Sequence, residues 1–381
     1  MTKIKHIMIV AGETSGDIHA AYLVREIKKI QPDIKFSGLG GWHLAAEGVE
    51  LYADLASLAV IGFVEVIKNL AKIKRLFDQF LEKADDLRPD AVILVDYPGF
   101  NLRMAEQLKK RNIKVIYYVS PQVWAWKEKR VKLIKRVTDL MLVFFDFEKT
   151  FYEERGLTVD FVGHPLIDHI KVTTGRQDLL ESKGLNPSAP VIGLLPGSRI
   201  KEVETLLPVM IAAARSIHQR IPSAQFVITK SHNIAPGLIN ACVHDLRFPV
   251  AVIDNEFHNT INSCDICIVA SGTATLETAL LEKPMVIIYK TNWLTYLIGR
   301  IFIKIKWIGL VNIVARKKIV PECIQGEASG KNIADKLIEI YNDPFRMETT
   351  INDLKDVRKK LGDSGASRRA AEKITSFLTT S

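Results

Sequence analysis

The stretch SGTATLE, residues 271–277, places small hydroxyl residues around a glycine directly after an apolar run. The first N–H groups of a helix lack partners and carry partial positive charge, so a strand-to-helix turn of this composition suits an anion. The groups that could hold phosphate there are those of Ser271, Gly272, Thr273 and Thr275. Glu277 would oppose a phosphate, but a carboxylate can accept hydrogen bonds from the vicinal hydroxyls of ribose. The stretch therefore indicates a nucleotide, and a plain capped helix with a first-turn glutamate fits it equally well.

A second turn of this kind is PGSR, residues 196–199, which ends the apolar run VIGLL. Gly197 lets the backbone approach a ligand, Ser198 can cap the following helix, and Arg199 stands beside the positive end of that helix. Arginine and a helix N-terminus together suit a diphosphate, which accepts several charge-assisted hydrogen bonds. A capped helix with a surface arginine is the alternative.

Asp96 ends the strongly apolar run AVILV and precedes Pro98-Gly99, so we expect a rigid element to hold it. A carboxylate that is partly desolvated there would have a raised pKa and could act as a general base toward an alcohol. A loop-capping aspartate is an equal alternative. Other polar residues of the first half follow apolar runs in the same way: Glu13, Ser15, Gly16 and Asp17, then Ser120, Gln122 and Trp124, and His164, for which a structural role is favoured.

Short β-branched runs alternate with segments of helical period through both halves of the chain. The expected strands lie in IKHIMIVAG, IKFSGLG, DAVILVDYP, KVIYYVSP, LMLVFF and VDFVGHP, then in VIGLLPGS, QFVITK, VAVID, ICIVASG and PMVIIYK. Strands alternating with helices predict parallel sheets, and 381 residues predict two domains. We expect two doubly wound α/β domains facing across a cleft, at residues 1–170, completed by a C-terminal helix at 364–381, and at 188–345. The polar stretch 168–190 is the expected connection.

The composition limits the partners and cofactors. The net charge of +9 and the pI near 9.2 favour an anionic partner. No nucleic-acid module is visible, and no phosphate-binding P-loop or correctly spaced dinucleotide motif occurs. Cys264 and Cys267 lie in an apolar run without a second pair, so we expect no metal and no cofactor.

Two segments mix basic residues with aromatic and aliphatic ones, at residues 293–310 and 61–83. Such a mixture suits the interface of an anionic membrane, although a core-facing helix explains the second segment equally well. The N-terminal apolar run is too short for a signal peptide, and no run is long enough for a membrane span. We therefore expect a protein that does not cross a bilayer but can touch an anionic membrane surface.

Six motifs in order resemble the lipid-A-disaccharide synthase family over nearly the whole chain. They are residues 12–17, 96–101, 121–126, 163–165, 196–199 and 271–277. One position departs from the family pattern, because Leu310-Val311-Asn312 stands where Leu-Pro-Asn is expected. The resemblance implies a GT-B fold, no metal, and transfer of 2,3-diacylglucosamine from its UDP conjugate to the 6-hydroxyl of 2,3-diacylglucosamine 1-phosphate. The products would be a β-1,6 disaccharide and UDP, and the resemblance implies a cytoplasmic protein that associates peripherally with the inner membrane.

The resemblance also implies a role for each loop. Asp96 would be the base of a single inverting displacement, and Arg199 with the turn at Ser271-Gly272 would stabilise the departing diphosphate. Glu277 would hold ribose, with Asn312 and Gln325 nearby. The acceptor would be bound by Glu13, Ser15, Gly16, Asp17, Asn101, Ser120, Gln122 and Trp124.

Three alternatives remain at this stage. Two are other UDP-sugar enzymes of the same fold, a peptidoglycan N-acetylglucosaminyl transferase and a UDP-N-acetylglucosamine 2-epimerase. The third is a peripheral membrane protein that binds nucleotide sugars without catalysis. The oligomeric state is open, and a homodimer is compatible with the sequence.

Overall fold

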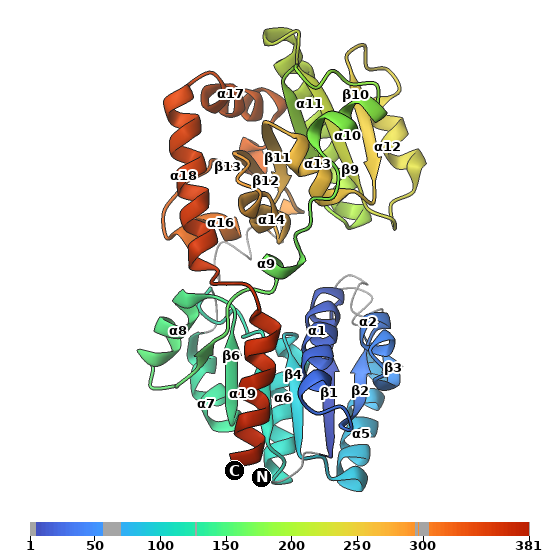
Figure 1. Ribbon diagram of the computed structural model, residues 1–381, viewed down its shortest axis with the longest axis vertical. Helices are drawn as coiled ribbons and strands as arrows, with labels where there is room; N and C mark the ends of the chain where they lie inside the picture. The colour runs from blue at the N-terminus through green and yellow to red at the C-terminus, as the bar shows by residue number, and fades with distance from the viewer. Residues whose placement is uncertain (1–4, 56–69, 126–127, 294–295, 297–304, 381) are drawn as a thin grey trace. The chain divides into compact units, whose positions relative to one another are not determined.

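The computed structural model describes residues 5–55, 70–125, 128–293, 296 and 305–380. The chain forms two compact units, each built around its own sheet (Figure 1). Unit 1 comprises Met1–Asp168 and Leu361–Ser381, and unit 2 comprises His169–Lys360. The last segment of the chain thus returns to the first unit.

The sheet of unit 1 has the strand order β3-β2-β1-β4-β5-β6-β7, and all its pairings are parallel. Its strands are β1 (His6–Ala11), β2 (Lys35–Gly40), β3 (Glu50–Asp54), β4 (Ala91–Val95), β5 (Val115–Tyr118), β6 (Leu140–Val143) and β7 (Asp160–Phe161). The inner strands β1 and β4 read HIMIVA and AVILV and are almost wholly buried. Near-continuous apolar strands of this kind are expected where helices cover both faces of a parallel sheet.

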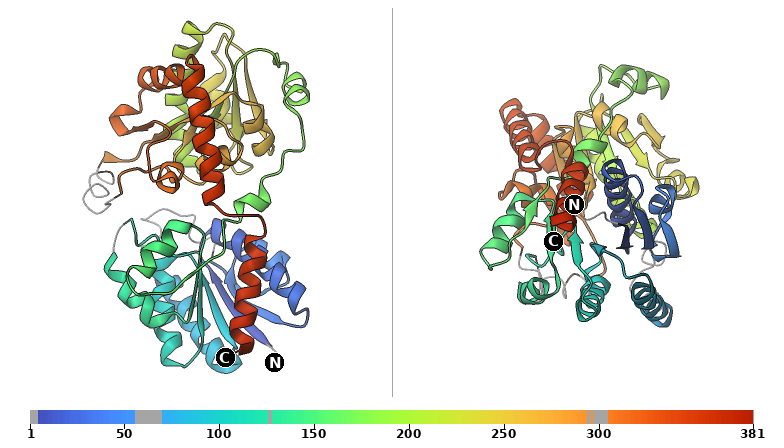
Figure 2. Two further views of the ribbon diagram at one scale, coloured as in Figure 1. Left: turned by 60° about the vertical axis from the view of Figure 1, so that its left-hand side comes forward. Right: turned by 60° about the horizontal axis from the view of Figure 1, so that its bottom comes forward.

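Helices cover both faces of this sheet (Figure 2). The helices are α1 (Thr14–Ile30), α2 (Trp42–Ala46), α5 (Leu70–Leu87), α6 (Pro98–Lys110), α7 (Val131–Val137), α8 (Asp146–Glu153), α9 (Leu166–His169) and α19 (Ala366–Thr380), with the short 3₁₀ turn η1 (Glu128–Arg130). The C-terminal helix α19 packs against α1, the first helix of the chain. Its buried stripe, which includes Ala370, Ile374 and Leu378, supplies part of the cover of unit 1.

The sheet of unit 2 has the order β10-β9-β8-β11-β12-β13 and is also entirely parallel. Its strands are β8 (Val191–Leu195), β9 (Gln225–Lys230), β10 (Val250–Asp254), β11 (Ile266–Ala270), β12 (Met285–Tyr289) and β13 (Glu322–Ile324). The helices are α10 (Arg176–Ser182), α11 (Ile200–Arg220), α12 (Pro236–Val243), α13 (Phe257–Ser263), α14 (Ala274–Leu280), α16 (Leu310–Ala315), α17 (Gly330–Tyr341) and α18 (Pro344–Lys360), with the 3₁₀ turn η2 (Gln325–Glu327). Helix α18 packs on α14, α16 and α17, so it belongs to unit 2 although most of it extends past the predicted range 188–345.

The segment expected to connect the domains is held by unit 2. Arg176, in α10, donates to both carboxylate oxygens of Asp265 at 2.9 and 3.0 Å. The same guanidinium also donates to the carbonyls of Pro187, Ala189 and Ser263. One forked side chain therefore fastens this segment to the start of the second sheet.

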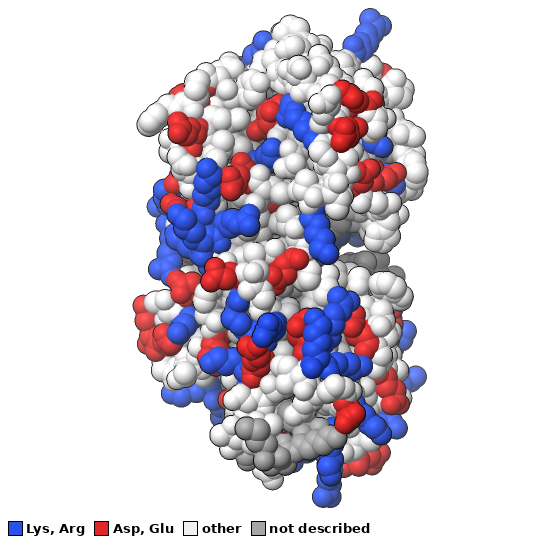
Figure 3. Space-filling model, viewed as in Figure 1, with Lys and Arg blue, Asp and Glu red and all other residues white. Residues whose placement is uncertain are grey.

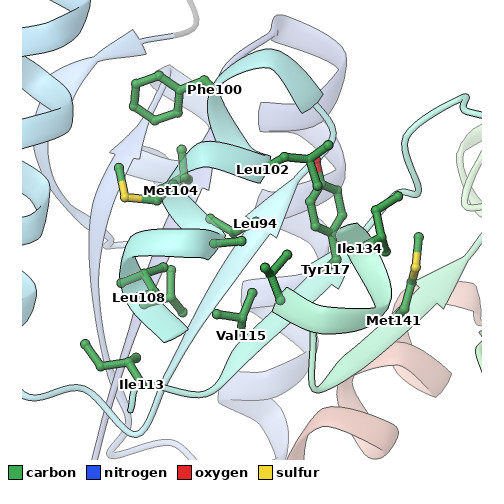
Figure 4. Close-up of a cluster of buried hydrophobic side chains, with 14 of the residues drawn as sticks. Leu94, Phe100, Leu102, Met104, Leu108, Ile113, Val115, Tyr117, Ile134 and Met141 are labelled. Carbon is green, nitrogen blue, oxygen red and sulfur yellow. The ribbon is translucent and has the colours of Figure 1, made fainter. Parts of the chain in front are cut away.

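Each unit has its own apolar core. Figure 4 shows part of the core of unit 1, where Leu94 and Val115 from the sheet meet Met104 and Leu108 from α6. Tyr117 carries its ring into this core and is fully buried. Its hydroxyl donates to the carbonyl of Asp96, the residue after β4.

The predicted fold class, two doubly wound α/β domains, is confirmed. Every strand expected from an apolar run is present. Two further strands, β3 and β13, were not expected. The first reads ELYAD and lies at the sheet edge, where its residues are partly exposed, and the second is three residues long.

Candidate active site

The candidate loops lie where each sheet reverses its strand order. In unit 1 the reversal falls between β1 and β4, and in unit 2 between β8 and β11. Parallel neighbours end at one edge, so residues 12–17 lie beside residues 96–101, and residues 196–199 beside residues 271–277. Ligands of open α/β sheets bind at this edge, at the point of reversal. The four loops singled out from the sequence thus form two pairs at the two expected positions.

Asp96 and Tyr97 form a strained turn after β4. Both have φ of 45°, in the left-handed region that residues other than glycine seldom adopt. The amide of Asn101 donates to the carbonyls of Val95 and Asp96 at 3.0 and 2.8 Å, and the hydroxyl of Tyr117 donates to the Asp96 carbonyl at 2.7 Å. Strain of this kind costs about 1–3 kcal/mol per residue and persists only where the surroundings hold it. Asn101 and Tyr117 provide that restraint.

The neighbouring loop of unit 1 packs directly under this turn. A Cβ added to Gly12 would lie 2.2 Å from the Tyr97 ring, so only glycine fits there. Glu13 follows as the N-cap residue of α1, and its side chain makes no capping hydrogen bond. Burial, with a smaller contribution from the nearby Glu13 carboxylate, raises the pKa of Asp96 to about 7. Asp96 is thus poised to exchange a proton near neutral pH.

Four residues predicted to bind an acceptor make hydrogen bonds within the protein. The Asp17 carboxylate is 1% exposed and accepts from the backbone N–H groups of Gly41 at 2.7 Å and His43 at 2.9 Å, which caps α2. The Ser120 hydroxyl and the Trp124 indole N–H both donate to Glu148, at 2.5 and 3.1 Å. Asn101 is buried and holds Asp96 as described. These four side chains shape the loops of unit 1 and leave direct ligand contact to others.

Glu148 is a buried carboxylate that the sequence interpretation missed. It also accepts from the backbone N–H of Phe145 at 3.2 Å, and burial raises its pKa to about 7. Its place three residues into α8, in a capping box, was the available signal. Of the other predicted acceptor residues, Ser15 and Gln122 are exposed, Glu13 is partly exposed, and Gly16 is buried against Val95.

His164 has the structural role that the sequence favoured. Its ring is buried and packs against Phe144 and Phe145, and its Nδ1 accepts from the backbone N–H of Leu166 at 3.2 Å. Burial holds the pKa of His164 well below its usual value. A neutral imidazole in this packing is a structural hydrogen-bond partner.

The turn at 196–199 presents an accessible cation. Gly197 has φ of 104°, and a Cβ there would meet the Glu202 carboxylate at 2.5 Å. Arg199 is the N-cap residue of α11, its side chain is 71% exposed, and it forms an ion pair of 3.3 Å with Glu202. Ser198 does not cap the helix, contrary to expectation, because it precedes the N-cap position and no side-chain cap bond forms. Asn233, from the loop after β9, donates to the Ser198 carbonyl at 2.9 Å.

In the second turn of unit 2, two hydroxyls are bonded to backbone carbonyls and the third residue, Thr273, is exposed. The Thr275 hydroxyl is fully buried and donates to the Gly272 carbonyl at 2.8 Å, so it closes the turn and does not face a ligand. The Ser271 hydroxyl donates to the Ile308 carbonyl at 3.2 Å. Thr273, the N-cap residue of α14, is exposed. Glu277 accepts a hydrogen bond from His258 at 3.0 Å, and its side chain is 18% exposed.

Asn312, which was predicted to lie at the nucleotide site, is held within the protein. It is fully buried in α16, beside the buried Val311. Its amide donates to the Val320 carbonyl and to Glu322, and its oxygen accepts from the N–H groups of Ile319 and Val320. Every hydrogen-bonding position of the side chain is filled, so Asn312 holds the segment 319–322.

Gln325 is likewise turned toward the protein backbone. Its oxygen accepts from the N–H of Thr291 at 2.8 Å, and its amide donates to the carbonyl of Thr291 at 3.0 Å. It borders a pocket of about 600 Å³ within unit 2, whose other walls include Pro208, Lys290, Trp293 and Ser329. Gln325 thus fixes the loop after β12 at the rim of this pocket.

Metal ligands and membrane-spanning helices can be considered only for the ranges of the chain that the structure describes. No group of three His, Cys, Asp or Glu side chains suitable for a metal ion occurs in these ranges. Across the same ranges no helix has the length and apolar character needed to cross a bilayer. The basic-apolar segment 293–310 is described only at 293, 296 and 305–310, and residues 61–69 of the segment 61–83 lie outside the described residues.

The fold defines the class of protein. The UDP-N-acetylglucosamine 2-epimerase of Neisseria meningitidis, solved bound to UDP-GlcNAc, superposes with a TM-score of 0.66 at 15% identity, over 97% of this chain and 100% of that one. The calicheamicin glycosyltransferase CalG4 superposes with a TM-score of 0.62 at 13% identity, over 100% and 99% of the two chains. At such identities the likeness concerns the fold alone. The chain has the GT-B fold of glycosyltransferases and epimerases.

The sequence comparisons narrow the class to one family. Residues 7–375 match the family described as Lipid-A-disaccharide synthetase. The lipid-A-disaccharide synthase of Geobacter sulfurreducens is 42% identical over 372 residues, which cover 98% of this chain and 97% of that protein. The chain therefore belongs to the lipid-A-disaccharide synthetase family and is a glycosyltransferase of lipid A biosynthesis. The family resemblance found in the sequence is confirmed, and the epimerase alternative shares only the fold.

Proposed function

We propose that this enzyme transfers 2,3-diacylglucosamine from UDP-2,3-diacylglucosamine to the 6-hydroxyl of 2,3-diacylglucosamine 1-phosphate. The products are a β-1,6-linked disaccharide and UDP. The observation that carries the proposal is the contrast between the two points of strand reversal in a member of this family. One offers a carboxylate with a raised pKa, Asp96, and the other offers an exposed cation, Arg199, and the N-terminus of α14 at Thr273.

Unit 2 binds the UDP part of the donor. Arg199 approaches the diphosphate, and its pair with Glu202 is no obstacle because an exposed ion pair contributes at most about 1 kcal/mol. The backbone of Gly197, Ser198, Gly272 and Thr273 lies at the same edge of the sheet. The Ser271 hydroxyl, now bonded to a carbonyl, can rotate to a phosphate oxygen. Glu277 accepts hydrogen bonds from the ribose hydroxyls.

Asp96 acts as the base. Its carboxylate takes the proton of the acceptor hydroxyl while that oxygen bonds to the anomeric carbon. The bond from this carbon to the diphosphate breaks, and its electron pair leaves with UDP, so one displacement inverts the anomeric configuration. Charge grows on the diphosphate in the transition state, where donors fixed in advance, such as Arg199 and the N–H groups of the Ser271 turn, stabilise it at little reorganisation cost. The reaction consumes no redox equivalents.

Unit 1 binds the acceptor through its exposed polar groups. Glu13, Ser15 and Gln122 are accessible at the edge where Asp96 lies. A carboxylate and a hydroxyl suit sugar hydroxyls, and Glu13 would repel the acceptor phosphate, which therefore points away from it. Asp17, Asn101, Ser120 and Trp124 support these loops from within.

The enzyme meets its lipid substrates at an anionic membrane surface, on the cytoplasmic face of the inner membrane. Lys and Arg alternate with Asp and Glu on the face drawn in Figure 3, with a denser basic group over the α18 side of unit 2. Helix α18 ends in Arg358, Lys359 and Lys360. Trp293, at the start of the basic-apolar segment, is 63% exposed. Exposed cations and an exposed indole are each suited to lipid headgroups.

Mass spectrometry of a two-substrate reaction tests this function. The full-length protein is incubated with the UDP-diacylglucosamine donor and the monosaccharide phosphate, and the disaccharide should appear in equal amount with UDP. Donor alone should release almost no UDP. A change of sugar configuration in donor alone would indicate an epimerase, and binding of donor without any product would indicate a non-enzymatic binding protein; either result contradicts the proposal.

A further inference from the structure

His258 stands between two parts of unit 2 that are far apart in sequence. It lies in the first turn of α13, and its Nε2 is 3.0 Å from Oε1 of Glu277. Its other ring nitrogen, Nδ1, accepts from the backbone N–H of Lys171 at 3.5 Å, a long hydrogen bond. Lys171 belongs to the segment that leads from unit 1 into unit 2. The imidazole thus joins this segment to the candidate ribose carboxylate.

The partners determine which ring nitrogen carries the proton. A backbone N–H can only donate, so Nδ1 must accept from Lys171. Nε2 then carries the hydrogen and donates it to the carboxylate of Glu277. With both nitrogens engaged, the ring orientation is fixed, as it is for histidines that hold a ligand group from behind.

The segment that meets Nδ1 is itself anchored to α13. The oxygen of Asn259, the residue after His258, accepts from the backbone N–H groups of Thr173 at 2.8 Å and Thr174 at 3.3 Å. The Asn259 amide donates to both threonine hydroxyls, at 3.0 and 3.3 Å. Asn259 is 7% exposed, so these bonds are sheltered from water. The Lys171 N–H is therefore held at a defined place beside the imidazole.

One carboxylate oxygen of Glu277 accepts a hydrogen bond, and the other can accept one from a ligand. Its Oε1 meets His258, while no donor among the described residues bonds Oε2. The residue lies in the first turn of α14, and its side chain retains 18% exposure. An unrestrained glutamate would sample several rotamers, of which only some direct Oε2 outward. The bond to His258 selects among them.

We propose that His258 is a positioning residue, which orients Glu277 so that the free Oε2 accepts from the ribose diol of the donor. The inference rests on the proposed function, because it needs Glu277 to be the ribose ligand. Its consequence is that donor affinity depends on the segment 171–174, which touches no nucleotide itself. His258 contacts neither the reacting atoms nor the acceptor, so it should affect donor binding and leave the chemical step alone.

Two substitutions separate the two bonds of the ring. In His258→Gln the amide nitrogen lies near the place of Nε2 and can still donate to Glu277. In His258→Asn the shorter amide lies near the place of Nδ1, so the bond to Lys171 can persist while the bond to Glu277 is lost. Loss of a hydrogen bond to a charged group should weaken UDP binding about tenfold in the asparagine variant. The glutamine variant should stay within about twofold to threefold of the parent, and turnover should be nearly unchanged in both.

Isothermal titration with UDP and 2′-deoxy-UDP reads out the effect. The parent should bind UDP more tightly than 2′-deoxy-UDP, and His258→Asn should lose most of that preference. In the double variant with Glu277→Gln, the His258→Asn substitution should cause no further loss of UDP affinity. Equal affinities of the Asn and Gln variants, or additive losses in the double variant, would overturn the positioning role. A parent that binds both nucleotides alike would instead remove Glu277 from the ribose site. Thermal melting of each variant, expected to match the parent, separates these results from misfolding.

Discussion

The two points of strand reversal have the same topology and opposite construction. In unit 1 the turn after β4 is strained at residues that have side chains, Asp96 and Tyr97, and buried groups hold it. In unit 2 the corresponding turns take their unusual φ at glycines, Gly197 and Gly272, and leave Arg199 exposed. A base needs partial burial to raise its pKa, and burial demands a rigid frame. An anion site needs a cation that stays hydrated until the ligand arrives, so glycine turns with little strain suffice.

The largest effect should come from the base. Asp96→Asn should lower turnover at least about a hundredfold, because the amide cannot take the acceptor proton. Steady-state rates of disaccharide formation provide the measurement. Asp86→Asn, an exposed carboxylate on α5, is the matched control and should behave as the parent. Unchanged turnover in Asp96→Asn would remove Asp96 from the mechanism.

Loss of the cation in unit 2 should rank second. Arg199→Ala should lower kcat/KM about tenfold to a hundredfold, since charge on the departing diphosphate loses one charge-assisted partner. Arg199→Lys should recover part of the loss, as it keeps the charge without the forked geometry. The exposed neighbour Lys201→Ala supplies the control for a simple change of net charge. An alanine variant with parental kinetics would place the diphosphate elsewhere.

The strained, buried base should also reduce stability, and removal of its charge should restore it. A carboxyl whose pKa is raised in the folded state binds its proton more tightly there than in the unfolded chain. Stability therefore falls as pH rises through the interval from the ordinary aspartate value of about 4 to about 7. The raised pKa corresponds to a loss of at most roughly 4 kcal/mol in the free energy of unfolding. Because Asp96 is partly exposed, we expect Asp96→Asn to raise the free energy of unfolding at pH 8 by only about 1–2 kcal/mol.

Thermal unfolding of parent and Asp96→Asn at pH 4.5 and pH 8 checks this sign. The variant should melt above the parent at pH 8, and the difference should shrink at pH 4.5, where the parent carboxyl is protonated. A variant that is less stable at both values would show that the Asp96 charge stabilises the fold, contrary to expectation.

A smaller effect should follow from loosening the turn without touching the carboxylate. Tyr117→Phe keeps the buried ring and removes only the hydroxyl that donates to the Asp96 carbonyl. Because Asn101 still holds that carbonyl, turnover should fall only about threefold to tenfold, the value of one neutral hydrogen bond. The KM for donor should not change. A rise in donor KM with constant kcat would contradict the claim that the Tyr117 hydroxyl holds Asp96 in place for catalysis.

The smallest effect concerns the exposed cation. Glu202→Gln removes the carboxylate that pairs with Arg199, so UDP should bind about twofold to fivefold more tightly at low salt. Glu204→Gln, an exposed residue of the same helix, makes the same change of net charge away from the turn and is the control. An equal gain in both variants would assign the effect to net charge alone.

The sequence was a good guide to topology because buried parallel strands are continuous apolar runs. Strand β4, AVILV, is fully buried, and the polar residue that follows it marks the edge of the sheet. Strand β3 escaped prediction because its place at the sheet edge permits polar residues, and β13 because three residues carry no pattern. Loop positions followed from topology, so the two loop pairs could be placed in advance.

The roles of single polar residues in those loops were harder to predict. Asp17 and Asn312 were expected to contact substrates, but each bonds a neighbouring loop, Asp17 at residues 41–43 and Asn312 at residues 319–322. A motif shows that a polar residue is needed at a strand end. It does not show whether the side chain faces a ligand or fastens a neighbouring loop, and Glu148 and His258 were missed for the same reason.

The division of work between the two units can be measured directly by titrating UDP into the parent, Asp96→Asn and Arg199→Ala. If unit 2 alone binds the nucleotide, Asp96→Asn should bind UDP with an affinity within about twofold of the parent while Arg199→Ala binds at least about tenfold more weakly. A loss of UDP affinity in Asp96→Asn as large as that in Arg199→Ala, or parental affinity in Arg199→Ala, would contradict this assignment.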